Sequence, residues 1–130
     1  MSEFSKAMGV STSALHMQAA RLRLISENIA NVDTPGYKRK TAGVKEVQTG
    51  FDALLAVQLG DTQIDGRALE KVFDPSHPLA DESGHYMGSN VDLIIEIADA
   101  QEAQRSYEAN LKVFDQTRQM SSSLMDLLRR

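Results

Sequence analysis

The sequence predicts a mainly α-helical chain, in which two long antiparallel terminal helices form a coiled-coil-like pair and a small β-rich element connects them. All three prolines and seven of the eight glycines lie between residues 35 and 88. Both residue types oppose a helix interior, and residues 10–34 and 89–130 contain neither. Both of these terminal segments also repeat apolar residues at alternating steps of four and three, which is the spacing of a coiled-coil seam.

The first helix is expected within residues 1–33. Its apolar stripe runs from Phe4 to Val32, and seven of its nine positions are apolar. Twenty-nine helical residues would give a rod of roughly 43 Å at about 1.5 Å per residue. We expect the assembly seam of this helix to be Leu15, Leu22, Ile25 and Ile29.

The second helix is expected within residues 90–130. Asn90 or Ser89 is the predicted N-cap, while Asp92 and Glu96 suit the positive end of the helix dipole. Its expected seam is Leu93, Ile97, Tyr107, Leu111, Phe114 and Met125.

Neither stripe can be buried by its own helix, so the two helices are expected to pack against each other. The polar interruptions of the two stripes can fix the register of the pair or await a partner from another subunit. Charge favours the ends meeting each other or other copies, because residues 1–40 carry a net charge of +3 and residues 41–130 carry −7.

The connecting segment, residues 34–89, is expected to contain turns and short strands. Thr34, Pro35, Gly36 and Tyr37 have the order of a type II turn, with proline and glycine at its centre. This segment has too little apolar material for a core of its own, so we expect it to rest on the helices. The candidate strands are residues 44–48, 56–62, 69–73 and 86–89, with a short helix over 51–59 as an alternative.

Composition excludes several classes of protein. The chain of 130 residues has no cysteine, which excludes disulfides, thiolate nucleophiles and cysteine-ligated zinc. A net charge of −4 without a basic stripe argues against nucleic-acid binding. No apolar run approaches the roughly 20 residues that span a bilayer, so no membrane insertion is expected. The first residues lack the apolar core of a secretory signal peptide.

Two polar clusters are candidate sites of chemistry. The cluster within residues 74–85 has ligand types suited to a divalent metal, but its spacing matches no closed zinc motif, so we interpret it as a solvated loop and expect no metal or cofactor. The other is the basic run at residues 38–40, which we also interpret as a solvated loop rather than a specific contact for acidic groups. The metal candidates are Asp74, His77, Asp81, Glu82 and His85.

Residues 28–39 read NIANVDTPGYKR. This string resembles the signature N-x-A-N-x-[DN]-T-P-G-Y-[KR] of the bacterial flagellar rod and hook family, and it lies at the end of the first helix, where that family places it. Asn31 is expected to stop the helix before the turn. The motif residues carried over are Asn28, Asn31, Asp33, Thr34, Pro35, Gly36 and Tyr37.

Three further stretches, residues 72–82, 90–93 and 105–111, resemble the proximal-rod members of that family. The resemblance implies a non-enzymatic structural subunit that assembles helically, with copies of itself and neighbouring rod subunits, into the drive shaft that transmits motor torque. It also implies export through the flagellar type III apparatus without a cleaved signal, and a place in the rod within the periplasm. The alternatives are another small rod protein, a metal-dependent enzyme built on the loop at residues 74–85, and a cytoplasmic coiled-coil adaptor.

Overall fold

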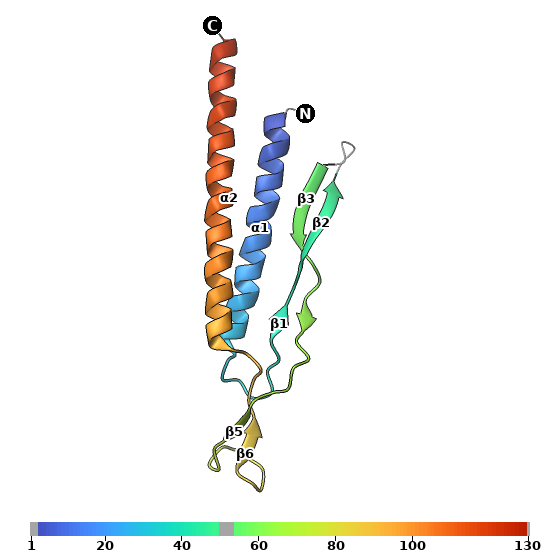
Figure 1. Cartoon of the computed structure of the whole chain (residues 1–130), viewed down its shortest axis with the longest axis vertical. Coiled ribbons are helices and arrows are strands. Elements are labelled where there is room, and N and C mark those ends of the chain that lie inside the picture. The colour runs from blue at the N-terminus through green and yellow to red at the C-terminus, as the bar shows by residue number, and fades with distance from the viewer. Residues whose placement is uncertain (1–2, 50–53, 130) are drawn as a thin grey trace.

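The computed structural model describes residues 3–49 and 54–129, and it contains two long helices with short strands between them. Helix α1 (Glu3–Ala30) and helix α2 (Leu93–Leu128) lie side by side and run in opposite directions, so that both termini lie at one end (Figure 1). The predicted fold class is therefore confirmed. Neither helix, over the residues described, has a stretch apolar enough to cross a membrane.

The helix ends are set by local hydrogen bonds. Helix α1 stops at Ala30, and the backbone N–H of Asn31 still donates to the Glu27 carbonyl at 3.1 Å. Helix α2 is capped by Asp92, whose carboxylate accepts from the backbone N–H of Ile94 at 3.0 Å. The expectation of a cap at Asn90 or Ser89 is wrong, because both of those side chains bind other parts of the chain.

Four of the strands form one long two-stranded ribbon. Strand β2 (Val44–Thr49) pairs antiparallel with β3 (Leu54–Leu59), and β1 (Lys40–Thr41) pairs with β4 (Gln63–Ile64). Between the two ladders, the N–H of Gly60 donates to the Gly43 carbonyl at 2.7 Å. The ribbon confirms strands at 44–48 and 56–62, although β3 ends earlier than expected.

The alternative helix over residues 51–59 is wrong for 54–59, which form β3, while residues 51–53 lie outside the described part of the chain. Strands β1 and β4 were not predicted. Each has only two residues, too few to show an alternating pattern.

The last two strands form a separate hairpin. Strand β5 (Lys71–Phe73) pairs antiparallel with β6 (His85–Met87), close to the expected 69–73 and 86–89. Gly84 closes the loop between them with φ +83°, and a Cβ atom there would come within 2.9 Å of the Phe73 ring. Glycine is therefore required at this position both by the backbone and by the space.

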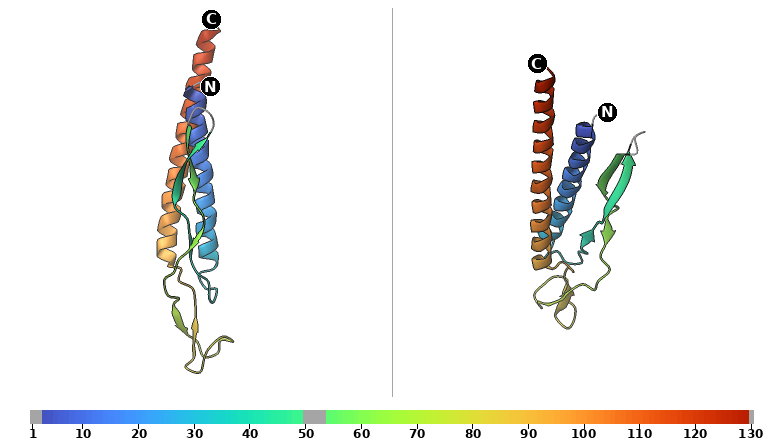
Figure 2. Two further views of the ribbon diagram at one scale, coloured as in Figure 1. Left: turned by 90° about the vertical axis from the view of Figure 1, so that its right-hand side faces the viewer. Right: turned by 45° about the horizontal axis from the view of Figure 1, so that its top comes forward.

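The molecule is layered, with α1 between α2 and the β2–β3 ribbon, while the β5–β6 hairpin projects past the base of the helices (Figures 1 and 2). The ribbon thus rests on α1, as expected for the connecting element, whereas the β5–β6 hairpin does not. The buried apolar core is small. Among the described residues it consists of Ala14, Met17, Ile25, Val91 and Ala103.

Candidate assembly site

The seam residues predicted on α1 lie against the rest of the chain. Ile25 is buried, and Leu15, Leu22 and Ile29 are half-buried. These side chains of α1 are covered because the helix contacts α2 on one side and β3 on the other.

The seam predicted on α2 divides into two groups. Tyr107 and Phe114 are half-buried, as expected for side chains near the helix pair. Four others are exposed, so α1 does not bury them in the free chain. They are Leu93 (42%), Ile97 (45%), Leu111 (41%) and Met125 (53%).

Near its base, helix α2 turns a different face toward α1 from the one its apolar stripe predicts. Glu96 and Ala103 are both fully buried on the inner side. At about 100° per residue, Leu93 and Leu111 lie roughly 60° around the helix from Glu96, and Ile97 lies roughly 100° around in the same direction. We call Leu93, Ile97 and Leu111 the outer flank of α2.

A cluster of polar side chains surrounds Glu96 at the base of the helix pair. We call the cluster the polar joint. It consists of Asn28, Arg39, Asp65, Asn90, Glu96 and Asp99.

Asn28 is fully buried, and the hydrogen bonds of its side chain tie α1 to the segment after the turn. Its amide nitrogen donates to the Lys40 carbonyl at 2.8 Å and faces the Glu96 carboxylate at 3.4 Å. Its amide oxygen accepts from the Tyr37 hydroxyl at 2.8 Å and from the Lys40 N–H at 2.9 Å. Burial, followed by the negative charge of Glu27, raises the pKa of Tyr37, so this hydroxyl keeps its proton as a donor.

Arg39 faces three carboxylates from two parts of the chain. Its guanidinium bonds to Glu96, donates to Asp99 at 3.1 Å, and lies 3.7 Å from Asp65. A buried carboxylate needs such a partner, because an unpaired charge in the interior is very costly. The Arg67 side chain, at 2.8 Å, and its backbone N–H hold the pKa of Asp65 below its usual range, which keeps that carboxylate charged.

The segment that enters α2 is joined to the segment that follows α1 by hydrogen bonds between side chains and the backbone. The Asn90 side chain accepts from the Arg39 N–H and donates to the carbonyls of Asp65 and Arg67, each at 3.1 Å. The Ser89 hydroxyl donates to the Val32 carbonyl. The chain entering α2 is therefore fixed to the chain leaving α1.

The turn after α1 has the geometry expected from its sequence. Gly36 has φ +77°, and the N–H of Tyr37 donates to the Thr34 carbonyl at 3.2 Å, as in a type II turn. Gly36 also donates its N–H to the carbonyls of Met87 and Gly88. The turn is thus a contact to the end of the β5–β6 hairpin.

The remaining motif residues have simpler surroundings. The Thr34 hydroxyl donates to the Asn31 side chain at 3.0 Å, and the Asn31 amide donates to the Glu27 carbonyl at 2.8 Å. Asp33 is exposed and Pro35 is half-buried. The motif therefore acts mainly through Asn28, Gly36 and Tyr37.

The interpretation of residues 38–40 as a solvated loop is wrong for two of the three. Arg39 belongs to the polar joint, and Lys40 pairs with Glu27, whose hydrogen bond raises the pKa of the lysine. Lys38 is exposed. Sequence reasoning missed Arg39 because its carboxylate partners lie up to 60 positions away. The sequence did contain one signal of a buried ion pair, because the charged Glu96 lies on the same helix face as Ala103.

The acidic loop at residues 74–85 uses its carboxylates to shape its own backbone. Asp74 accepts from the hydroxyl of Ser76 at 2.7 Å, and Asp81 accepts from the Ser83 hydroxyl at 2.6 Å and the His85 N–H at 3.0 Å. These bonds hold the pKa of Asp81 below its usual range. Within residues 3–49 and 54–129, no group of three or more histidines and carboxylates could hold a metal ion.

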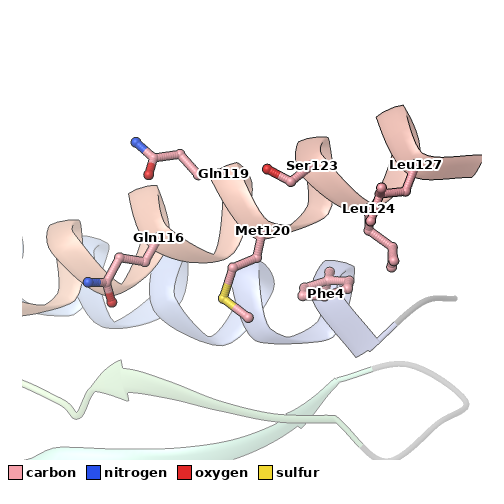
Figure 3. Close-up of a pocket in the computed structure, with 7 residues that line it drawn as sticks. All are labelled: Phe4, Gln116, Gln119, Met120, Ser123, Leu124 and Leu127. Carbon is pink, nitrogen blue, oxygen red and sulfur yellow. The ribbon is translucent and has the colours of Figure 1, made fainter.

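A groove lies near the free end of the helix pair, where α2 extends past the start of α1. Figure 3 shows Phe4 of α1 facing α2, between the side chains of Met120 and Leu124. Met120 is 59% exposed and Leu127, also in the groove, is 64% exposed. Apolar side chains thus remain uncovered at this end as well as along the outer flank.

Comparison with known proteins shows which family this chain belongs to. Residues 8–38 match the family described as "Flagella basal body rod protein", and residues 82–127 match "Flagellar basal body rod FlgEFG protein C-terminal". A flagellar basal-body rod protein FlgC from Agrobacterium fabrum is 39% identical over 99% of this chain and 98% of its own length. The chain belongs to the FlgC family.

Two further FlgC proteins have similar coverage. The relative from Salmonella typhimurium is 32% identical over 91% of this chain, and the one from Bacillus subtilis is 28% identical over 92%. As a FlgC-family member, the chain is a structural, non-enzymatic subunit of the flagellar basal-body rod and assembles with other rod subunits. This confirms the predicted family and sets aside the metal-dependent enzyme and the cytoplasmic adaptor.

Proposed function

We propose that this chain builds the proximal part of the rod by assembling helically with copies of itself and with neighbouring rod subunits. In this proposal, residues 1–33 and 90–130 form the inner core of the drive shaft that transmits motor torque. Residues 34–89 face outward from that core. The antiparallel helix pair supports the assignment, since it is the longest and most regular part of the chain.

The observation that carries the proposal is the uncovered apolar surface of α2. Eleven of its large apolar side chains are more than a third exposed, and Ala103 is its one buried apolar residue among those described. Apolar surface on this scale normally marks a protein–protein interface. A subunit that packs helically against several neighbours needs such surface on more than one side of its helices.

We also propose that the chain reaches the periplasm through the flagellar type III export apparatus, without a cleaved signal peptide. The support is the resemblance to rod proteins together with the small core. A chain that buries few apolar side chains loses little stabilisation on unfolding, which suits passage in an unfolded state. Neighbouring subunits would then supply the missing burial after export.

The test is a substitution on the outer flank. Leu111→Asp places a charge where the proposal puts a subunit contact, but Leu111 is 41% exposed in the free chain. We expect the purified variant to keep its helical circular dichroism, while cells carrying it as their sole copy form no rods and do not swim.

The matched control is Leu111→Met, which keeps the position apolar and should swim normally. Normal swimming and intact rods with Leu111→Asp would contradict the proposal.

A further inference from the structure

Near its base, helix α2 offers two faces that could be buried against α1, and the one that carries a carboxylate is chosen. The structure buries Glu96 and Ala103, and it leaves the outer flank, Leu93, Ile97 and Leu111, between 41% and 45% exposed. A roll of about 60° around the helix axis would bring the flank inward and carry Glu96 outward.

The outer flank would have a partly apolar surface to roll onto. Tyr107, which belongs to the same predicted stripe, already lines a shallow groove between the helices with Ala19, Leu22, Arg23 and Ser26 of α1. Burying apolar side chains is favourable, whereas burying an unpaired carboxylate is strongly unfavourable. Without a compensating partner for Glu96, the rolled arrangement would therefore be preferred.

The compensating partner is Arg39. Its guanidinium bonds to Glu96 and to Asp99, both on α2, while its backbone N–H is held by Asn90. Asn28 of α1 adds an amide at 3.4 Å from the Glu96 carboxylate. The backbone of Arg39 is thus held by a residue outside α2, while its side chain binds two residues of that helix.

We propose that Arg39 is a positioning residue that sets the roll of α2 and so keeps the outer flank free for neighbouring subunits. Buried polar groups of this kind commonly fix register and orientation rather than add stability. The inference deepens the proposed function, because the roll matters for assembly only if the outer flank is a subunit contact.

The roll can be measured in the isolated chain of 130 residues, which has no cysteine of its own. Two single-cysteine reporters, Ile97→Cys and Ala103→Cys, lie on the exposed and buried sides of α2. Their rates of reaction with N-ethylmaleimide are compared in three backgrounds: the natural chain, Arg39→Met, and Arg39→Met with Glu96→Leu. Circular dichroism follows helix content in each background.

In the Arg39→Met background, Glu96 loses its cation and should turn outward. We expect labelling at position 97 to slow at least tenfold and labelling at position 103 to accelerate at least tenfold. Adding Glu96→Leu removes the buried charge, so both rates should return to within twofold of the natural chain. If Arg39 only stabilised the fold through its ion pair, Glu96→Leu would not restore the rates. Restoration by an apolar residue therefore shows that Arg39 acts on the roll of α2.

The control is Arg21→Met, which removes the Arg21–Glu102 pair at 3.7 Å between the same two helices. Glu102 is 67% exposed, so this variant should change neither rate. Rates within twofold of the natural chain in Arg39→Met, acceleration at both positions, or failure of Glu96→Leu to restore them would each overturn the inference. Labelling is measured in the free chain, whereas Leu111→Asp tests assembly in cells. A failure of this inference can therefore be told from a failure of the proposed function.

Discussion

At the scale of single residues, Asn28 explains why an asparagine stands at the start of the rod-family motif. Its side chain needs both a donor and an acceptor, because it bonds to the Lys40 carbonyl, the Lys40 N–H and the Tyr37 hydroxyl. Aspartate would lose the donor, and leucine would lose both. Since the residue is fully buried, water cannot replace the lost partners.

Asn28→Ala should destabilise the chain by about 2 kcal/mol, because it leaves buried polar groups without partners. The free energy of unfolding from urea denaturation followed by circular dichroism would measure this. Asn110→Ala is the matched control, since the Asn110 side chain donates within its own helix, to the Ser106 carbonyl at 2.8 Å. Equal losses of stability in the two variants would contradict the role given to Asn28.

The residue scale also shows how far sequence reasoning reaches. The turn could be predicted because Pro35 and Gly36 restrict their own backbone, whatever surrounds them. The contacts of Arg39 could not, since Glu96 lies 57 positions away and only the folded chain brings them together. The backbone conformation of a turn depends on the residues of the turn itself, whereas a long-range ion pair depends on the fold of all the residues between its partners.

At the scale of elements, periodicity predicted both helices but not which face of α2 is buried. A hydrophobic stripe predicts the inner face only when apolar burial decides the packing. In α2 the buried Glu96 decides it near the base, so the stripe is rotated outward. The short strands β1 and β4 escaped prediction because they depend on pairing with each other.

The burial pattern predicts uneven stability along the helix pair. The buried residues of α1 lie between Ser11 and Asn28, and those of α2 are Glu96 and Ala103. We expect backbone amides of residues 106–128 in the free chain to exchange with deuterium at least tenfold faster than those of residues 97–103, because little packing holds that part of α2. Uniform protection along α2 would contradict this account.

At the scale of the whole molecule, the charge asymmetry is used to hold the ends together. The basic first 40 residues pair with the acidic remainder through Arg21–Glu102 and through Arg39 with Glu96, Asp99 and Asp65. The layered arrangement then leaves much of α2 uncovered. As a rod protein the chain assembles with other rod subunits, and we propose that these neighbours cover the exposed side chains of α2.

In the proposed rod, neighbouring subunits cover the outer flank of α2. Reaction of Leu111→Cys with N-ethylmaleimide, compared between the free chain and isolated basal bodies, tests this directly. We expect fast labelling in the free chain, where Leu111 is 41% exposed, and labelling at least tenfold slower in the assembled rod. Rates within twofold of each other in the two states would contradict the claim.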